Sequence, residues 1–482
     1  MRVLFVASEA FPLIKTGGLG DVVGALPPAL IELGVDVRIL MPGYHRVLME
    51  VGSTKRVAEL GDSYGVGHVG LLEACMPDSK APIYLIDCPS LYDRDHGPYG
   101  DSEGVDWPDN DLRFGLLGWV AARLCQDSSP LDWKPQVLHG HDWQAGLAPA
   151  YLHAWGESRP KSLFTIHNIA YQGQFPAETM SRIKLPPSLY SIHGVEYYGM
   201  LSFLKAGCYY STRLNTVSPT YAVEIQGADH GSGLQGLLAS RSQELTGILN
   251  GVDYKIWNPA KDKLLTHRYP PGNIAGKQAN KIALQKELDL EIREQAPLFS
   301  MISRLTWHKG IDLVISVLPT IIQRGGQFVA VGTGEHGIED SLRDLAKRYP
   351  KQVAVHIGYS EERAHQTMAA ADFLLMPSRS EPCGLTHLYG YRYGVVPITT
   401  RVGGLADTVV DCTPSALTTR TGTGFVATEP SLDGLSEAVL RGLDLYFQPD
   451  IWPNLSQHVA GLDFGWRWAA MAYRDLYAEL AT

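Results

Sequence analysis

The residues best suited to chemistry in this sequence are two basic side chains in the short segment 303–310. Arg304 ends a predicted strand and Lys309 starts a predicted helix. Both can reach a crevice beside the free N–H groups of that helix, and such groups together with cations bind phosphates. A solvated surface pair is the alternative, but a short loop has little other reason to carry both charges. We therefore predict a diphosphate site here.

A carboxylate lies next to a second anion site in residues 377–386. Glu381 precedes a turn, and a predicted helix opens at Gly384, Leu385 and Thr386. The backbone N–H groups of that helix start would hold a phosphate, with Glu381 beside an attached sugar. A glutamate that only caps the helix is the alternative. An anion site next to a carboxylate favours sugar-nucleotide transfer.

A glycine-rich loop follows the first predicted strand. Lys15 adds a cation, and Gly17, Gly18 and Gly20 permit close backbone approach at a helix start, which indicates an anionic ligand. A turn that only caps the helix is the alternative. The dinucleotide fingerprint G-x-G-x-x-G is not met, because Val23 stands where its third glycine belongs.

Two further predicted strands end in histidines. His139, His141 and Asp142 lie at the end of one of them, and His167 and Asn168 lie at the end of the next. Asp142 is either part of a site or a plain helix N-cap. A metal site would need a further histidine or carboxylate ligand that other residues orient by hydrogen bonds. The sequence shows no such ligand, so we predict no metal. His167 lies among hydrogen-bonding and aromatic residues, a mix typical of sugar binding.

Two other positions are weaker candidates. Asn250 precedes Gly251, and a hairpin-type Asn-Gly turn explains the pair equally well. Tyr359 follows a predicted strand and offers a flat face on which a base can stack.

These candidates are positioned by two series of alternating strands and helices, the pattern of parallel βαβ units. The first series has predicted strands at 2–7, 35–42, 136–140, 162–168 and 215–218, and helices at 21–33, 109–126, 144–155 and 196–210. The second has strands at 298–303, 327–331, 353–357, 373–376 and 396–399, and helices at 311–323, 338–348, 361–370 and 385–393. Residues 254–280 are predicted as a linker and surface excursion, and residues 464–480 as an amphipathic helix. The fold class is therefore α/β, with two doubly wound domains. Ligands bind beyond the carboxyl ends of such strands, so two such domains facing each other would form a deep cleft.

Composition excludes several partners. The 482 residues carry a net charge of −10 and have 45% apolar content, which suits two cores but not nucleic acid. Apolar runs stay below the ~18–20 residues of a membrane span. Glu9 and Pro12 interrupt the N-terminal run too early for a signal peptide. The six cysteines show no C-x-x-C pattern, which favours a reducing cytoplasm over disulfides or structural zinc.

Taken together, these segments resemble the bacterial glycogen and plant starch synthases of glycosyltransferase family 5, which have the GT-B fold of two Rossmann-like domains. The resemblance runs along the whole chain through ordered motifs at residues 15–19, 141–145, 165–168, 250–253, 303–306, 381–386 and 403–407. It implies an acceptor-side domain at 1–252, a nucleotide-sugar domain at 253–455, and a terminal helix at 456–482 that crosses back to the first domain.

The resemblance also implies an activity: retaining transfer of glucose from ADP-glucose to the non-reducing-end 4-hydroxyl of glycogen or another α-1,4-glucan, without a cofactor. The ADP-glucose diphosphate would be approached by Lys15, Gly17 and Gly18 and held by Arg304 and Lys309. The resemblance further implies that Cys383, Gly384, Leu385 and Thr386 in the 381–386 motif contact the distal phosphate. Tyr359 would contact the adenine. The glucose would be contacted by Asp142, His167, Asn250 and Glu381.

His308 and His387 depart from the family pattern, where glutamine is common, and both are expected near the diphosphate. Three other functions fit less well. A glucan phosphorylase needs a lysine-bound pyridoxal phosphate segment, which is missing. An NAD dehydrogenase needs the third glycine. A non-catalytic glucan-binding protein leaves the cations beside Glu381 unexplained.

Overall fold

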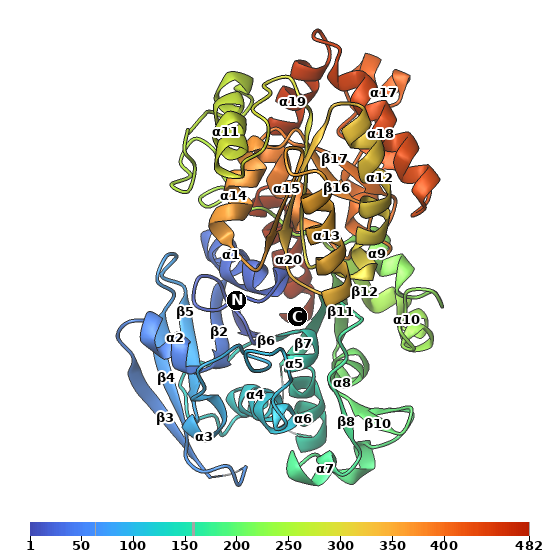
Figure 1. Cartoon of the computed structure of the whole chain (residues 1–482). Coiled ribbons are helices and arrows are strands. Elements are labelled where there is room, and N and C mark those ends of the chain that lie inside the picture. The colour runs from blue at the N-terminus through green and yellow to red at the C-terminus, as the bar shows by residue number, and fades with distance from the viewer. Residues whose placement is uncertain (63, 157–159, 482) are drawn as a thin grey trace. The chain divides into compact units, whose positions relative to one another are not determined.

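The computed structural model describes residues 1–62, 64–156 and 160–481, and the chain divides into two units (Figure 1). Unit 1 contains Met1–Gly251 and Trp466–Thr482, and unit 2 contains Val252–Gly465. Within the described residues, no helix is both long and apolar enough to cross a membrane.

Unit 1 is built on a nine-stranded sheet with the order β12-β11-β7-β6-β1-β2-β5-β4-β3. Its strands are β1 (Arg2–Val6), β2 (Asp36–Pro42), β3 (Lys55–Gly61), β4 (Val69–Cys75), β5 (Pro82–Asp87), β6 (Val137–His141), β7 (Lys161–Ile166), β11 (Arg213–Thr216) and β12 (Leu245–Gly247). The pairs β3·β4 and β4·β5 are antiparallel, and the others are parallel. The order reverses between β1 and β6, so ligands are expected at the carboxyl ends of these two strands.

Helices and a small second sheet complete unit 1. The helices are α1 (Gly18–Glu32), α2 (His45–Glu50), α3 (Pro89–Tyr92), α4 (Asn110–Leu124), α5 (Asp142–Ala145), α6 (Leu147–Trp155), α7 (Thr179–Arg182), α8 (Phe203–Tyr210), α9 (Pro219–Glu224), α10 (Gln235–Ser240) and α20 (Trp466–Ala481). The small sheet has the order β8 (Gln174–Pro176), β10 (Met200–Ser202), β9 (Glu196–Tyr197). The buried face of α20 joins the main core of unit 1, so the C-terminal helix is integral to that unit.

Unit 2 has a six-stranded parallel sheet with the order β15-β14-β13-β16-β17-β18. The strands are β13 (Leu298–Ile302), β14 (Gln327–Gly332), β15 (Val353–Ile357), β16 (Phe373–Met376), β17 (Val396–Thr400) and β18 (Phe425–Ala427). Most are apolar and buried throughout, as expected for parallel strands covered on both faces. The sheet grows in opposite directions from β13 and β16, which is the doubly wound pattern that we expected.

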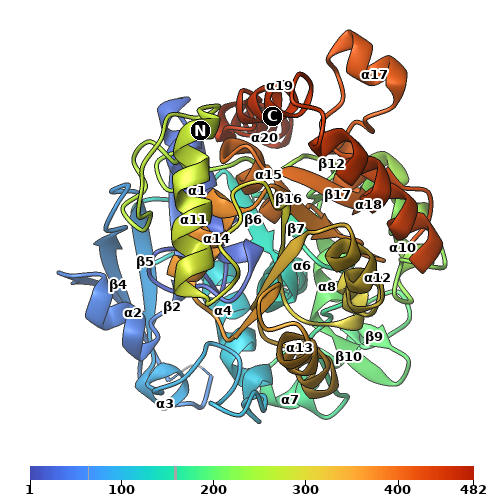
Figure 2. The same cartoon turned by 45° about the horizontal axis from the view of Figure 1, so that its top comes forward.

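The helices of unit 2 include five that the sequence analysis missed, at residues 274–287, 403–408, 414–419, 432–446 and 452–460. They are α11 (Ile274–Glu287), α12 (Ile311–Gln323), α13 (His336–Arg348), α14 (Glu361–Ala370), α15 (Leu385–Arg392), α16 (Gly403–Thr408), α17 (Pro414–Thr419), α18 (Leu432–Tyr446) and α19 (Trp452–Ala460). The predicted linker 254–280 overlaps α11, which packs on α14 (Figure 2). The expected boundary at 455/456 falls inside α19, because Trp452, Leu455 and Val459 are buried in the core of unit 2.

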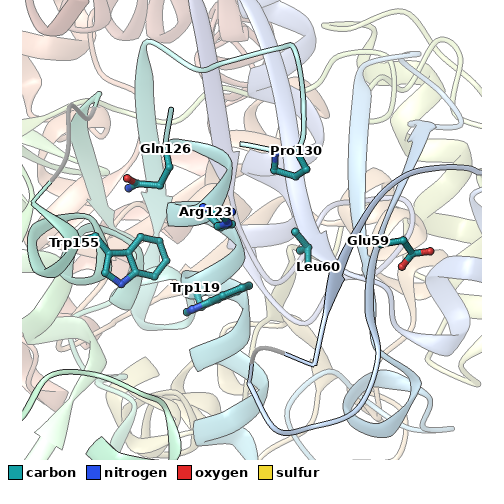
Figure 3. A pocket seen from close by; sticks show the side chains of 7 residues that line it. All are labelled: Glu59, Leu60, Trp119, Arg123, Gln126, Pro130 and Trp155. Atoms are coloured by element: carbon teal, nitrogen blue, oxygen red, sulfur yellow. The ribbon is translucent and has the colours of Figure 1, made fainter. Parts of the chain in front are cut away.

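Two other expectations need correction in unit 1. Residues 196–210 do not form one helix: residues 196–202 contribute to β9 and β10, and α8 starts only after Ser202, whose Oγ accepts a hydrogen bond from Lys205 N. The strands β3, β4 and β5 were not predicted. They form an antiparallel extension of the sheet, and a pocket opens between β3, α4 and α6 (Figure 3).

Candidate functional site

The reversal point of the unit 2 sheet brings together the predicted cation and carboxylate. Lys309 follows β13 and Glu381 follows β16, and these strands are neighbours. Lys309 Nζ lies 2.6 Å from Glu381 Oε2, and Ser378 Oγ donates to the same oxygen at 3.0 Å. Glu381 is buried, so these two donors set the orientation of its carboxylate.

The two loops that carry this pair are joined by Arg379. Its guanidinium forms two hydrogen bonds of 2.8 Å to the carboxylate of Asp312, and Nη1 also donates to Trp307 O at 2.8 Å. The same guanidinium lies 4.1 Å from the centre of the Trp307 ring. The backbone adds a bond from Arg379 N to His308 O at 2.8 Å. Arg379 was not predicted from the sequence, because its partners come from the other loop.

Glycines allow the close approach of these loops. Gly310 has a φ of 70°, and a Cβ there would lie 2.1 Å from Pro377 O. Gly384, with a φ of 79°, is the N-cap of α15, and Leu385 and Thr386 begin that helix. Cys383 is buried just before it. The free N–H groups at the start of α15 therefore follow the Glu381 loop, as an anion site requires.

The remaining predicted residues of unit 2 have different environments. Arg304 is exposed directly after β13, and Tyr359 is 69% exposed after β15, where its hydroxyl donates to Glu361. His387 is instead buried, and its Nε2 is 2.7 Å from Thr408 Oγ1. Burial lowers the pKa of His387 to about 4. His387 therefore stays neutral near pH 7 and adds no charge to a phosphate site.

In unit 1, a buried glutamate holds the glycine-rich loop. Glu9 accepts hydrogen bonds from the backbone N–H groups of Thr16 and Gly17 and from the hydroxyl of Tyr99. Burial raises the pKa of Glu9. Gly17 is the N-cap of α1, and Lys15 Nζ lies 2.9 Å from Asp21 Oδ1 in the first turn of that helix. The sequence analysis missed this contact of Glu9 with the loop, because the partners of Glu9 depend on the path of the loop.

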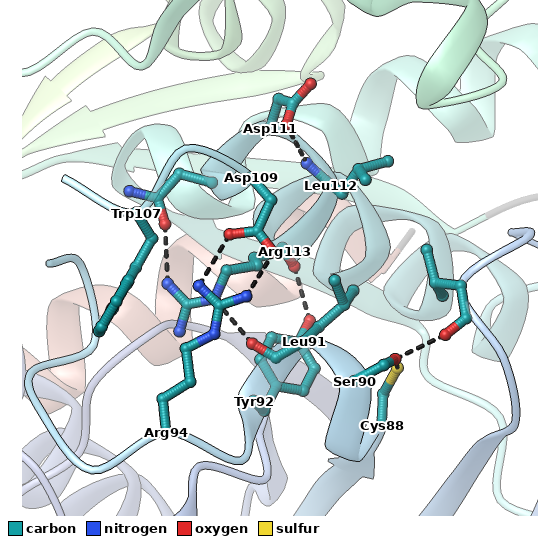
Figure 4. Close-up of polar contacts among 12 residues, drawn as sticks. Cys88, Ser90, Leu91, Tyr92, Arg94, Trp107, Asp109, Asp111, Leu112 and Arg113 are labelled. Atoms are coloured by element: carbon teal, nitrogen blue, oxygen red, sulfur yellow. Dashed lines mark hydrogen bonds and ion pairs between the residues drawn. The ribbon is translucent and has the colours of Figure 1, made fainter.

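The segment that supplies Tyr99 is fixed by two arginines (Figure 4). Arg94 forms hydrogen bonds of 2.9 and 2.5 Å to the two carboxylate oxygens of Asp109. Arg113 is buried on α4, where its Nε donates to Leu91 O at 2.9 Å and its Nη1 to Pro98 O at 2.7 Å. The contact between Tyr99 and Glu9 is therefore part of an ordered polar network.

Asp142 and His167 meet at the carboxyl ends of β6 and β7. Asp142 Oδ1 accepts from His167 N at 2.7 Å and from Asn168 N at 3.3 Å. The side chain therefore bridges two loops, and the N-cap alternative for Asp142 is wrong: the N-cap of α5 is His141. Burial raises the pKa of Asp142 to about 7.

His167 and its neighbours are buried and neutral. His167 Nε2 lies 3.0 Å from His141 Nδ1, and burial lowers the pKa of His167 to about 3. His139 contacts the hydroxyl of Tyr477 on α20 at 2.7 Å. Asn250 is also buried, and its Oδ1 has no hydrogen-bond partner among the described residues. His139 is fully paired, since its Nε2 also lies 2.6 Å from Thr165 Oγ1, whereas Asn250 Oδ1 remains able to accept a hydrogen bond from a hydroxylated ligand.

The described part of the chain contains no group of three or more His, Cys, Asp or Glu side chains placed to hold a metal ion.

The predicted residues form two sets, one in each unit. The set in unit 1 is Lys15, Gly17, Gly18, Asp142, His167 and Asn250, and the set in unit 2 is Arg304, Lys309, Tyr359, Glu381, Cys383, Gly384, Leu385 and Thr386.

Comparisons with known proteins cover both units. The family described as starch synthase catalytic domain matches residues 2–240, and the family described as glycosyl transferases group 1 matches residues 285–449. The chain is 53% identical to a glycogen synthase of Paramagnetospirillum magneticum, over 100% of this chain and 98% of the relative. It is 47% identical to a glycogen synthase of Nitrosomonas europaea, over 99% and 97% of the two chains.

Solved structures give the same picture. The catalytic domain of Starch Synthase IV from Arabidopsis thaliana, bound to ADP and acarbose, has a TM-score of 0.89 at 29% identity and covers 100% of this chain and 99% of its own. A sucrose-phosphate synthase from Thermosynechococcus elongatus has a TM-score of 0.59 at 15% identity, with coverages of 99% and 98%, a likeness in fold alone.

Proposed function

The chain belongs to the glycogen and starch synthase family of glycosyltransferases, and on this premise we propose that the two sets of residues above form its donor and acceptor sites. The protein is a hexosyltransferase of GT-B fold. It transfers glucose from ADP-glucose, with retention, to the non-reducing-end 4-hydroxyl of an α-1,4-glucan and releases ADP. The ion pair between Lys309 and Glu381 at the reversal point of unit 2 carries the proposal for the site.

The donor diphosphate would bind in unit 2 at the start of α15. Free N–H groups at Gly384, Leu385 and Thr386 would hold the distal phosphate, and Arg304 and Lys309 would neutralise the charge that grows on ADP as the glycosidic bond breaks. Such preorganised donors commonly supply the largest share of rate enhancement. The bound ADP named for the Arabidopsis relative supports this nucleotide.

Glu381 would face the glucose of the donor. Lys309 and Ser378 hold one of its oxygens, so the carboxylate is oriented before substrate arrives. A fixed carboxylate stabilises the positive charge that develops on the sugar ring. Tyr359, being exposed, would stack on the adenine, and Cys383 would line the same loop.

Unit 1 would complete the site with one cation and several neutral groups. Lys15 and the backbone of Gly17 and Gly18 would approach the diphosphate. His167 stays neutral because its pKa is about 3, so it would hydrogen-bond a sugar hydroxyl rather than supply charge. Asn250 Oδ1 and Asp142 would serve the same sugar.

The test is release of ADP from ADP-glucose in the presence and absence of glycogen, with UDP-glucose as competing donor and with a chelator in one arm. We expect glycogen-dependent ADP release, preference for ADP-glucose and no effect of chelation. Lys309→Ala should lower kcat by about 100-fold or more. Lys347→Ala, at an exposed lysine on α13, is the matched control and should leave kcat unchanged. Near-normal turnover in a folded Lys309→Ala variant would remove Lys309 from the site.

A further inference from the structure

The exposed ring of Tyr359 is attached to the body of unit 2 through a carboxylate. Tyr359 lies between β15 and α14, and its hydroxyl donates a hydrogen bond to Glu361 Oε2 in the first turn of α14. Ser360, between the two, is the N-cap of that helix, and its Oγ accepts a hydrogen bond from Arg363 N. The cap orders the backbone, and the contact with Glu361 restricts the ring of Tyr359.

Glu361 is in turn held by a histidine one helical turn further along α14. Glu361 Oε1 lies 3.5 Å from His365 Nε2, within ion-pair distance, and this nitrogen has no hydrogen-bond partner among the described residues. His365 is buried, and its other nitrogen, Nδ1, lies 2.7 Å from Asp262 Oδ2. The imidazole therefore has a carboxylate beside each of its two nitrogens, an arrangement that favours the protonated ring.

Aromatic rings set the plane of this imidazole. Trp257 stacks on His365, with ring centroids 3.9 Å apart and an interplanar angle of 16°, and Tyr389 also stacks on this indole at 4.2 Å and 6°. The hydroxyl of Tyr393 lies 3.4 Å from His365 Nδ1. The ring cannot turn away from Glu361 without breaking these contacts. An indole face also attracts a cation, which adds to the effect of the carboxylates.

The charged side chains of α11, the helix that packs on α14, have partners other than His365 or are exposed. Lys277 Nζ donates to three backbone carbonyl oxygens at 3.1–3.3 Å. Lys281 Nζ lies 2.6 Å from Asp372 Oδ2, and Glu287 pairs with an arginine of α14. Lys286 is exposed. These groups therefore do not compete for the imidazole.

The other elements around α14 add no charge at this position. On α15, His387 pairs with a threonine hydroxyl, and the guanidinium of Arg392 lies over the ring of Tyr254. Strands β13 and β14 carry no charged residue. Arg268 donates its Nε hydrogen bond to the backbone oxygen of Asp262. The carboxylates of the two residues beside the ring nitrogens are therefore the charges that face His365.

Protonation of His365 decides whether Glu361 is attracted or repelled. Burial alone would lower the pKa of His365, but the hydrogen bond to Asp262 and the carboxylate of Glu361 outweigh it and raise the pKa. Below that pKa, a proton on Nε2 attracts Glu361. Above it, Asp262 keeps the remaining proton on Nδ1, and the lone pair of Nε2 faces a carboxylate. The positions of Glu361 and Tyr359 are then less restricted.

We propose that Glu361 is a positioning residue for the nucleotide: it orients the ring of Tyr359 for stacking, and the His365 imidazolium orients Glu361. The inference rests on the proposed function, since it takes Tyr359 as the residue that stacks on adenine. A ring that is held before the ligand arrives loses less conformational freedom on binding, which strengthens affinity by about threefold to tenfold.

The experiment measures the Kd of ADP by calorimetry near pH 6 and near pH 9. Near pH 6, Glu361→Ala and Tyr359→Phe should each raise the Kd about threefold to tenfold. The double variant should bind no more weakly than either single variant, because both remove the same contact. Near pH 9 wild type should approach these variants. The KM for ADP-glucose should rise by the same factor, with a smaller effect on kcat.

Glu361→Gln distinguishes positioning from a purely structural role. An amide at this position can accept from the Tyr359 hydroxyl and donate to the neutral His365 Nε2, but its N–H clashes with the protonated ring. This variant should therefore bind ADP about threefold more weakly than wild type near pH 6 and more tightly than wild type near pH 9. A comparison at one pH cancels the ionisation of ADP and of Lys277, whose pKa burial lowers to about 7.

Glu362→Ala is the matched control. Glu362 lies in the same helical turn and is exposed, and its Oε1 accepts from Gln366 Nε2 at 3.2 Å, so its removal deletes the same charge without touching Tyr359. Its ADP Kd should stay within about twofold of wild type at both pH values.

Additive losses in Glu361→Ala and Tyr359→Phe, or an equal ratio of Glu361→Gln to wild type at both pH values, would overturn the proposal. If wild type binds ADP with the expected pH dependence but releases none from ADP-glucose, the transferase proposal fails and the positioning role stands. If ADP release depends on glycogen while Glu361→Ala binds ADP as wild type does, the positioning role alone fails.

Discussion

Asp142 combines two features that oppose folding in unit 1. Its backbone has a φ of 56°, in the left-handed region, and its carboxyl group is buried at the junction of two loops. Burial raises its pKa from 3.8 to about 7, although the N–H groups of His167 and Asn168 partly compensate. Residues that store strain of this kind cluster at functional sites.

Asp142→Asn should therefore raise stability while lowering activity. Since the folded pKa exceeds the unfolded value, wild type loses stability as the pH rises from about 4 to 7 and levels off above that. Asparagine tolerates the left-handed backbone and can still accept both N–H bonds. We expect a gain of roughly 1–3 kcal/mol at pH 8 that vanishes near pH 4, measured by urea unfolding, and a fall in kcat of about tenfold or more.

Asp262→Asn in unit 2 is the control, because we expect it to change the stability at pH 8 in the opposite direction. Burial alone would raise the pKa of Asp262, but bonds from His365 Nδ1 at 2.7 Å and Tyr393 OH at 2.6 Å outweigh it and lower the pKa. This carboxylate stabilises the fold above its unfolded pKa and loses that effect as the pH falls through its folded pKa. The asparagine variant should be less stable at pH 8. Stabilisation by both substitutions would contradict the burial argument.

At this scale the sequence predicted which residues follow strand ends but not how they pair. Lys309 was expected at a diphosphate and Glu381 beside the attached sugar, because both lie in loops between a predicted strand and a predicted helix. Their 2.6 Å contact depends on β13 lying next to β16, which no local pattern reveals. Glu9 was missed for a related reason, since its acceptor role depends on the path of residues 10–17.

At the scale of elements, the parallel strands were easier to predict than the antiparallel ones. Buried parallel strands are continuous apolar runs, such as β13 and β14. Strand β3 is a polar edge strand, and β9 and β10 have two and three residues, so their patterns carry little signal. Residues 196–202 were taken into a helix for that reason.

Two glycines, one at the end of the first loop and one in α1, differ in whether the surrounding residues leave room for a side chain. A Cβ on Gly17 would meet no other atom of the described residues within 4 Å, and its φ of −157° is extended backbone. A Cβ on Gly24, inside α1, would lie 2.4 Å from Phe11 O. Gly17 is therefore free to take a side chain as far as folding is concerned, whereas Gly24 is not.

Gly17→Ala should leave the free energy of unfolding within about 0.5 kcal/mol of wild type but lower kcat/KM for ADP-glucose about tenfold or more, because a methyl group would block approach of the diphosphate. Gly24→Ala should cost about 1–3 kcal/mol despite the better helix propensity of alanine. Urea unfolding and initial rates measure both. Equal losses of stability in the two variants would contradict the distinction.

At the scale of the whole molecule, the chain passes between the units twice. In unit 2, Val252 N donates to Phe464 O at 2.7 Å, so both crossings leave that unit at one point. In unit 1, Gly251 lies against Trp466, where an added Cβ would be 2.6 Å from its Cα. The two connections between the units therefore lie next to each other within each unit.

If Lys15 and Arg304 act on one diphosphate, as proposed above, their substitutions should be energetically coupled. Lys15 belongs to unit 1 and Arg304 to unit 2, and both are proposed to contact one pyrophosphate. When two groups act together on one transition state, the free-energy losses from removing each of them are not additive. Once the first group is lost, the second contributes less, so removing it costs less. The loss of kcat/KM in Lys15→Ala/Arg304→Ala should be smaller than the product of the single losses by about tenfold, or about 1.4 kcal/mol.

The same cycle with Lys15→Ala and Lys347→Ala supplies the baseline, since Lys347 is exposed on α13 and pairs with Asp344. Those two effects should multiply within error, because residues without shared partners act independently. Initial rates over a range of ADP-glucose concentrations at saturating glycogen give kcat/KM for every member of both cycles. Full additivity of Lys15 and Arg304 would mean that the two units do not act on the same phosphates. The residues that act on the diphosphate would then have to belong to one unit.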